Sequence, residues 1–229
     1  MVKIWGIVPA AGIGSRMQSD RPKQYLLLNN KPIIEHAISC LLPAVSGIAI
    51  AIADHDSWWS FPPSPLLVRC AGGEQRVNSV LSALNKLLEV GAIESDWVLV
   101  HDAARPLLPD QDLGKIISHI RAGNTSPVIL ATPLADTIKK SPDGVAVSST
   151  VDRNQLWRAL TPQAAPLGLL RDSLLQALEA GVSITDESSA LEYAGHPPVI
   201  ISGCPSNIKI TLPSDLLIAE ALLKSEGDK

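Results

Sequence analysis

Short apolar runs alternate with longer amphipathic segments along almost the whole chain, and this alternation restricts the possible folds more than any other feature. The apolar runs are rich in Val and Ile, which is typical of buried β-strands; they span Lys3–Val8, Ile48–Ala53, Leu66–Val68, Trp97–Val100, Val128–Ala131, Val199–Ile201 and Ile208–Ile210. Helical periodicity, beginning each time at Pro or an acidic residue, covers Pro32–Leu42, Glu74–Val90, Asp110–Ala122, Pro166–Ala180, Asp186–Ala194 and Pro213–Lys224. The pattern predicts a three-layer α/β/α fold with a mostly parallel sheet, and ligands bound beyond the carboxyl ends of the strands.

The alternation stops in residues 133–160. Here Thr137–Lys140 and Val145–Ser148 are typical of two short strands, and Ser141–Gly144 has the composition of the turn between them. An isolated hairpin is marginally stable in water, so we expect this arm to pack against a partner.

Composition limits the class of protein. The 229 residues suit one domain over residues 1–229, with 133–160 as a subregion. A net charge of −4 disfavours nucleic acid as a partner.

The sequence also bears on the compartment. The absence of a signal sequence and of a long apolar span disfavours a membrane and predicts a cytoplasmic protein. Cys40, Cys70 and Cys204 lack the spacing of a zinc site, so we expect reduced thiols.

The first predicted strand leads directly into a loop of small residues. The loop is Pro9-Ala10-Ala11-Gly12-Ile13-Gly14-Ser15-Arg16, and Pro22-Lys23-Gln24 follows shortly after. Gly12 and Gly14 allow positive φ and close approach of the backbone, so that successive N–H groups can face a polyphosphate. Arg16 and Lys23 would neutralise its charge. The sequence therefore predicts a phosphate site, against the alternative of a tight turn beside two solvated cations.

Two other phosphate-binding patterns fit this loop poorly. A P-loop requires a lysine directly after its last glycine, and none stands there. A dinucleotide-binding loop requires a third glycine where this chain has Met17, and a ribose-binding acid for which only Glu35 and Asp54 are candidates. An ATPase of the P-loop type and an NAD-dependent oxidoreductase are therefore disfavoured.

A carboxylate follows the predicted strand Trp97–Val100, within the sequence His101-Asp102-Ala103-Ala104-Arg105-Pro106. If this strand neighbours the first, Asp102 lies near the phosphate loop. A carboxylate beside phosphates is repulsive unless a divalent cation or a sugar hydroxyl intervenes. Asp102 is thus a candidate for a Mg²⁺ shell or a ribose contact, and the alternative is an ion pair with Arg105.

Further polar residues stand at the ends of predicted elements: Arg153, Thr161, Thr185 and Lys209. Alone, each has a structural explanation. Thr185 suits the N-cap of the following helix, Arg153 suits an exposed surface, and Lys209 suits the solvent-facing position of an alternating strand.

Taken in order, however, the polar motifs resemble one family. They are Ala-Ala-Gly-x-Gly-x-Arg, Pro-Lys-Gln-Tyr, Gly-Gly-x-x-Arg-x-x-Ser, His-Asp-Ala-Ala-Arg-Pro, Thr-Pro-Gln, Thr-Asp-Glu-Ser and Asn-Ile-Lys-x-Thr, between Ile4 and about Leu217. The chain is similar to the 2-C-methyl-D-erythritol 4-phosphate cytidylyltransferases of the methylerythritol phosphate route to isoprenoids. The resemblance implies a Rossmann-like nucleotidyltransferase fold whose β-arm crosses into a second subunit, and hence a homodimer. It also implies CMP transfer from CTP to methylerythritol 4-phosphate, with Mg²⁺ bridging phosphates near Asp102.

The resemblance also implies roles for individual residues. Arg16 and Lys23 would stabilise the transition state, and Arg153 and Lys209 would hold the attacking phosphate as part of the catalytic set. Nucleotide binding would fall to Pro9, Ala10, Ala11, Gly12, Gly14, Gly73, Ser79, Asp102 and Ala103. Contacts to the acceptor would come from Thr137, Thr161 and Thr185 as well, with Thr137 and Arg153 the candidates to act across the dimer.

One departure from the family pattern and two alternative functions remain to be considered. Relatives often carry an acidic residue in place of Gln75 or Asn78, which affects the base contacts rather than the reaction class. A sister enzyme that uses another polyol phosphate, such as ribitol 5-phosphate, would share the same loop and cations. A nucleotide-binding scaffold without activity would share the fold, although the presence of both predicted cation pairs argues against it.

Overall fold

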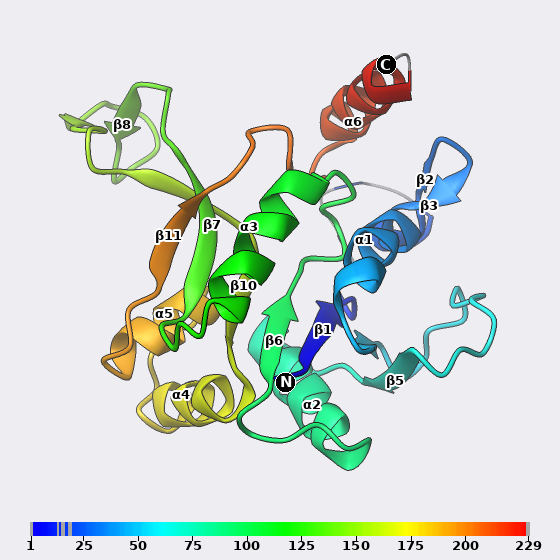
Figure 1. The fold of residues 1–229 in the computed structure, drawn as a ribbon. Helices are drawn as coiled ribbons and strands as arrows, with labels where there is room; N and C mark the ends of the chain where they lie inside the picture. Colours follow the sequence, from blue (N-terminus) through cyan, green and yellow to red (C-terminus); the bar gives the residue numbers. More distant parts are fainter. Residues whose placement is uncertain (1, 13, 15–16, 18–19, 228–229) are drawn as a thin grey trace.

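A central seven-stranded sheet organises the chain in this computed structural model, which describes residues 2–12, 14, 17 and 20–227 (Figure 1). The strand order is β11-β7-β10-β6-β1-β4-β5. The strands are β1 (Ile4–Pro9), β4 (Ile48–Ile52), β5 (Leu67–Ala71), β6 (Trp97–Val100), β7 (Val128–Pro133), β10 (Trp157–Pro166) and β11 (Val199–Ser202). Strand β10 runs antiparallel to both neighbours, β6 and β7, and the other pairings are parallel. The mostly parallel sheet predicted from the sequence is confirmed.

Helices cover both faces of this sheet because successive side chains of a strand point to opposite sides. From β1, Ile4 and Val8 pack in the cluster that contains α1 (Ile33–Leu41) and α3 (Asp110–Arg121). Trp5 and Ile7 pack in the opposite cluster with α2 (Arg76–Glu89), α4 (Leu167–Glu179) and α5 (Glu187–Tyr193). All five helices fall within the ranges of helical periodicity predicted from the sequence, and the three-layer architecture is confirmed.

The C-terminal helix α6 (Pro213–Gly227) packs beside these layers, where its buried Ala219 contacts a third cluster that includes Leu28 and Ile210. The same region holds the short strands β2 (Leu27–Leu28) and β3 (Lys31–Pro32) and the 3₁₀ turn η2 (Lys23–Tyr25); a second turn, η3 (Leu42–Ala44), follows α1. Within the part of the chain described, no helix is both long and apolar enough to cross a membrane.

The predicted strand at Ile208–Ile210 is wrong, and the sheet contains β10 in its place. The Ile208 segment crosses the carboxyl ends of the strands, and its backbone bond to the core is made by Ile210 N to Ala104 O at 2.8 Å. Strand β10 lies partly in the predicted arm. It contains Pro162, which opposes a strand assignment. The register shifts at that point, between Ala159 and Gln163, and a β-bulge is one of the places where a strand accommodates proline.

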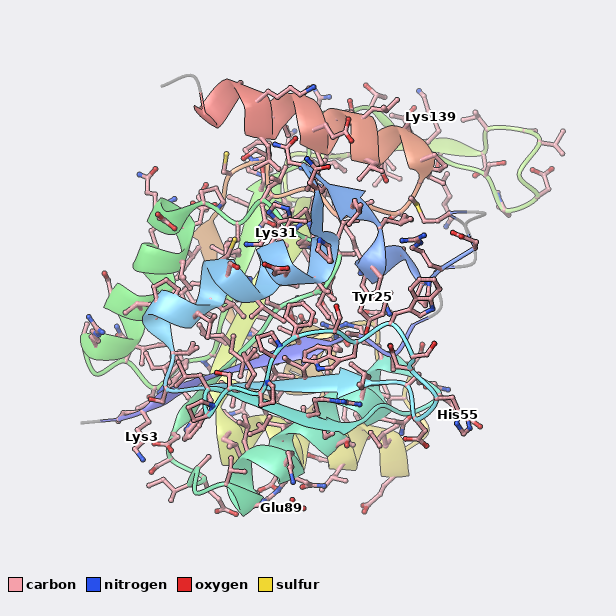
Figure 2. All side chains as sticks on the ribbon, turned by 90° about the vertical axis from the view of Figure 1, so that its right-hand side faces the viewer. Lys3, Tyr25, Lys31, His55, Glu89 and Lys139 are labelled. Carbon is pink, nitrogen blue, oxygen red and sulfur yellow. The ribbon has the colours of Figure 1, made fainter. Side chains whose placement is uncertain are left out.

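The arm contains a hairpin of its own, formed by β8 (Ile138–Lys140) and β9 (Ser149–Val151), that projects from the body in Figures 1 and 2. The predicted second strand, Val145–Ser148, is wrong. Those residues belong to the connecting loop, because Asp143 Oδ1 accepts hydrogen bonds from the N–H groups of Val145 and Ala146 and so closes a tighter turn. Val145 is 90% exposed, so its side chain has no cover within the chain.

Candidate active site

A cavity of about 190 Å³ lies where β1 and β6 end. These strands are parallel neighbours, with Ile7 paired to Val100, so the loops that follow them meet at one edge of the sheet. The sequence hypothesis that Asp102 lies beside the first loop is therefore confirmed. Five segments line the cavity: Pro9–Gly12, Lys23–Gln24, Gly73–Arg76 with Ser79, Asp102–Ala104 and Lys209.

The first loop and the lysine after it are fitted to each other. Gly14 has φ of +65°, and a Cβ there would lie 2.8 Å from Lys23 Cγ, so any other residue would be strained and would displace the lysine. Gln24 is 4% exposed and its amide donates to Ala10 O at 2.6 Å, while Lys23 Nζ donates to Ile210 O at 3.3 Å. The Tyr25 hydroxyl donates to Asp56 Oδ2 at 2.7 Å, so the other two residues of η2, Gln24 and Tyr25, are both anchored by their side chains. Arg16 lies outside the described residues.

The turn before α2 brings backbone groups to the cavity. A Cβ on Gly73 would lie 2.3 Å from Asn78 Cβ, so only glycine fits this close approach. Gly73 N donates to Ser79 Oγ at 3.1 Å, which fixes the predicted nucleotide-binding hydroxyl against the turn. Asn78 Oδ1 accepts from Gln75 N at 3.3 Å, so Gln75 and Asn78 together hold the start of the helix.

Asp102 is the centre of a buried ion cluster. Its Oδ1 accepts from Arg76 Nε at 3.1 Å, and its Oδ2 lies 2.8 Å from Lys209 Nζ and 3.6 Å from Arg105 Nε. Burial raises the pKa of the Asp102 carboxyl, but Arg76 and Lys209 outweigh burial and hold that pKa far below its usual range. The ion pair with Arg105, offered as the alternative, is present together with contacts that the sequence did not reveal.

A chain of hydrogen bonds holds the backbone of Asp102. Its N–H donates to Thr161 Oγ1 at 3.1 Å, and that hydroxyl lies 2.9 Å from His101 Nδ1. His101 Nε2 is 2.9 Å from Arg105 O, which can only accept, so Nε2 carries the hydrogen and Nδ1 accepts from Thr161. Burial lowers the pKa of His101 to about 4, which keeps the ring neutral. Thr161, predicted to contact the acceptor, thus uses its hydroxyl to position Asp102 and is absent from the cavity lining.

Lys209 reaches the cavity from the segment that crosses the strand ends. Asn207 is fully buried in that segment, its amide donates to Thr161 O at 2.7 Å, and its carbonyl accepts from Arg105 Nη1 at 2.6 Å. The segment is thereby fixed two residues before Lys209. The alternative that Lys209 is a strand residue is wrong, because the segment forms no strand; the side chain is exposed, as expected, but its ammonium pairs with Asp102.

The other predicted acceptor contacts lie elsewhere. Thr137 and Arg153 line a separate cavity on the arm, of about 370 Å³, and Arg153 donates to Ala135 O. Thr185 is exposed, and the N-cap of α5 is Asp186, whose Oδ1 accepts from Ser189 N at 3.0 Å. A single copy of the chain does not bring these three residues to the cavity that contains Asp102.

The described residues fit a protein-bound magnesium ion poorly. Both oxygens of Asp102 already face cations, and no group of three His, Cys, Asp or Glu side chains in the described ranges is arranged to hold a metal. Mg²⁺ sites built on one or two carboxylates depend on those oxygens being available. The hypothesis that Asp102 is a metal ligand therefore has no support from this geometry.

A small-residue loop after the first strand, beside cations at the carboxyl edge of a mostly parallel sheet, defines a nucleotide-binding α/β protein equipped to handle phosphates. The family model for 2-C-methyl-D-erythritol 4-phosphate cytidylyltransferase (IspD) matches residues 4–225. The chain belongs to this family.

Curated relatives and solved structures agree with this assignment. The chain is 47% identical to the 2-C-methyl-D-erythritol 4-phosphate cytidylyltransferase of Vibrio vulnificus strain CMCP6, with 100% of this chain and 98% of the relative covered. It is 46% identical to that of Pseudomonas aeruginosa strain PAO1, with 93% of each covered. The crystal structure of the Francisella tularensis protein superposes with a TM-score of 0.84 at 33% identity, covering 96% of this chain and 99% of that one.

Proposed function

We propose that this protein transfers CMP from CTP to 2-C-methyl-D-erythritol 4-phosphate, giving 4-diphosphocytidyl-2-C-methyl-D-erythritol and pyrophosphate in the non-mevalonate route to isoprenoids. The observation that carries the proposal is the single cavity in which the β1 loop, Lys23 and the Asp102–Lys209 pair meet. Full-length relatives named for this activity support it.

The reaction needs no covalent enzyme intermediate. A phosphate oxygen of the acceptor attacks the α-phosphorus of CTP, the new P–O bond forms, and the bond to the β-phosphate oxygen breaks to release pyrophosphate. Two anions must meet and charge grows on the transferring group, so catalysis rests on positioning and on fixed cations. Lys23, anchored beside the loop, is placed to stabilise that charge.

Lys209 suits the acceptor phosphate. Its Nζ is held at 2.8 Å by Asp102, and its side chain lines the cavity and is 40% exposed. A phosphate dianion that enters the cavity meets an ammonium group whose position is already fixed, which lowers the cost of ordering it on binding.

We propose that Mg²⁺ accompanies CTP, held by the phosphate oxygens rather than by Asp102. The proposal follows from charge: both oxygens of Asp102 are paired with cations, while a triphosphate supplies free oxygen ligands of the kind Mg²⁺ prefers. The chemistry of such an ion is charge neutralisation on the phosphates. A cytoplasmic location likewise stays a prediction from the sequence.

We propose that two copies associate through the arm, so that Thr137 and Arg153 of one subunit serve the cavity of the other. Two observations favour this arrangement. The hairpin projects from the body with Lys139 at a distance from the sheet (Figure 2), and its loop leaves Val145 and Val147 90% and 62% exposed. Apolar side chains on an isolated hairpin are characteristic of a surface that is covered by a partner.

The activity is tested by pyrophosphate release with CTP and Mg²⁺. Methylerythritol 4-phosphate and ribitol 5-phosphate are offered in parallel, with ATP, GTP and UTP as nucleotide controls. We expect release with CTP and methylerythritol 4-phosphate alone. Preference for ribitol 5-phosphate would select the sister enzyme, and no release with any pair would indicate a scaffold without activity.

The shared site is tested by mixing two inactive variants, Lys23→Ala and Arg153→Ala, after mild dissociation and reassociation. If the arm acts across the dimer, half of the reassociated dimers are mixed and each has one intact site, so about a quarter of wild-type activity should return. Each variant alone, treated in the same way, should stay inactive. Failure of the mixture to regain activity, with dimers shown by light scattering, would place Arg153 in its own subunit's site.

A further inference from the structure

Glu187 at the start of α5 is almost fully buried, with 1% of its surface exposed. Its two carboxylate oxygens accept from Arg76, Oε1 from Nη1 at 2.6 Å and Oε2 from Nη2 at 3.0 Å. This two-bond arrangement fixes the plane of the guanidinium group as well as its position. Although 111 residues separate the two in sequence, the pair joins α5 to the first residue of α2.

The remaining nitrogen of the same guanidinium continues the chain of contacts into the cavity. Arg76 Nε donates to Asp102 Oδ1 at 3.1 Å, and Asp102 Oδ2 holds Lys209 at 2.8 Å. Arg76, Asp102 and Lys209 line the cavity, whereas Glu187 is not among the lining residues. Glu187 therefore lies outside the cavity and reaches it through Arg76, whose neighbours Asp102 and Lys209 carry opposite charges in turn.

Attachment of α5 to the sheet does not explain the Glu187–Arg76 pair. Gln163 on β10 already fastens the start of that helix, because its amide donates to Asp186 Oδ2 at 2.9 Å and its carbonyl oxygen accepts from Ser188 N at 2.8 Å. Buried ion pairs are also poor sources of net stability, since desolvation offsets the attraction. The geometry gives the pair a different task, which is to set the orientation of Arg76.

We propose that Glu187 is a positioning residue for cytidylyl transfer: by holding Arg76 it keeps Asp102, and through it Lys209, in the arrangement that receives the acceptor phosphate. The inference rests on the proposed function. Without the charge of Glu187, Arg76 has one anionic partner instead of two and turns toward Asp102, where it competes with Lys209 for the same carboxylate. Because one negative charge beside the cavity is removed, the net charge around the cavity rises by one at the same time.

The test is Glu187→Gln, which keeps size and removes charge. We expect kcat to fall about tenfold through misplacement of Lys209, whereas KM for CTP should stay level or fall because the cavity is more positive. A merely structural defect would instead lower the fraction of folded enzyme, which the melting temperature reveals, and it would not depend on Arg76. The matched control is Glu192→Gln, an exposed carboxylate on the same helix, which should retain wild-type kinetics.

Dependence on Arg76 is tested by a double-mutant cycle. In an Arg76→Met background, Glu187→Gln should cause no further loss of kcat, because the residue it acts through is gone. Glu187→Asp, which keeps the charge on a shorter side chain, should lie between wild type and Glu187→Gln, and it supplies the same cycle if the glutamine variant does not fold. Melting temperatures verify folding.

Two results would overturn the inference while the wild type is active: wild-type kcat in Glu187→Gln, or losses that multiply in the double variant. An inactive wild type would overturn the proposed function itself. The two failures are thus distinguished in a single set of assays.

Discussion

Replacing Lys23 with alanine is expected to reduce kcat by about 10²–10³-fold while changing KM for CTP much less. Lys23 is proposed to act on charge that develops in the transition state, and removal of one such fixed donor typically has an effect of this size. The fold should tolerate the change, since the bond described for the lysine Nζ goes to a backbone carbonyl, Ile210 O at 3.3 Å, and not to a buried charge. Steady-state kinetics with CTP and methylerythritol 4-phosphate measure both constants.

Lys31→Ala is the matched control for this experiment. Lys31 is close in sequence and pairs with Glu35 at 3.2 Å, outside the cavity, so its loss should leave both constants near wild type. A Lys23→Ala enzyme with an unchanged turnover number would remove Lys23 from the transition state. A large rise in KM with kcat preserved would assign it to ground-state binding of CTP instead.

The sheet and the helices could be predicted because burial produces a recognisable apolar pattern in the sequence, continuous in a strand covered on both faces and periodic in a helix. Strand β1 is apolar at every position from Ile4 to Val8 except Gly6, as a strand covered on both sides must be. Strand β10 left no such record. Its buried polar residues Thr161 and Gln163 bond to His101 and α5 rather than facing solvent. The polar residues that suggested the end of a helix or strand therefore belong to the core.

The site could be predicted where a rule connects sequence to space. Parallel strands end at the same edge, and this rule placed Asp102 beside the first loop. No such rule brings Arg76 to Glu187, because that pair depends on how α5 and α2 pack. The glycine-rich motif that contains Arg76 was a usable signal for the arginine, whereas Glu187 was not separable from an ordinary first-turn acid of a helix.

Asp102→Asn is expected to lower the free energy of unfolding by about 3 kcal/mol at neutral pH, because it leaves Lys209 and Arg105 without their anion and Arg76 with Glu187 alone. The value is placed at the low end of the range for broken buried pairs since the Lys209 side chain is 40% exposed and can regain water. Urea unfolding of the two proteins measures the difference. Asp172→Asn is the control, because Asp172 is 68% exposed in its pair with Arg171 and should contribute little.

The pH dependence of the free energy of unfolding tests whether the charge of Asp102 causes this stabilisation. Its pKa in the folded protein is held below the unfolded value by Arg76 and Lys209 against the effect of burial. The stabilisation is therefore fully present above the unfolded pKa of about 3.9 and is lost as the pH falls from there toward the folded pKa. The stability gap between wild type and Asp102→Asn should be constant near neutrality and should narrow below about pH 4. Other carboxylates titrate in both proteins, so they cancel in the difference. A gap that stays constant into acid would mean that the aspartate acts through its shape and hydrogen bonds, and that its charge does not hold the cations of the cavity in place.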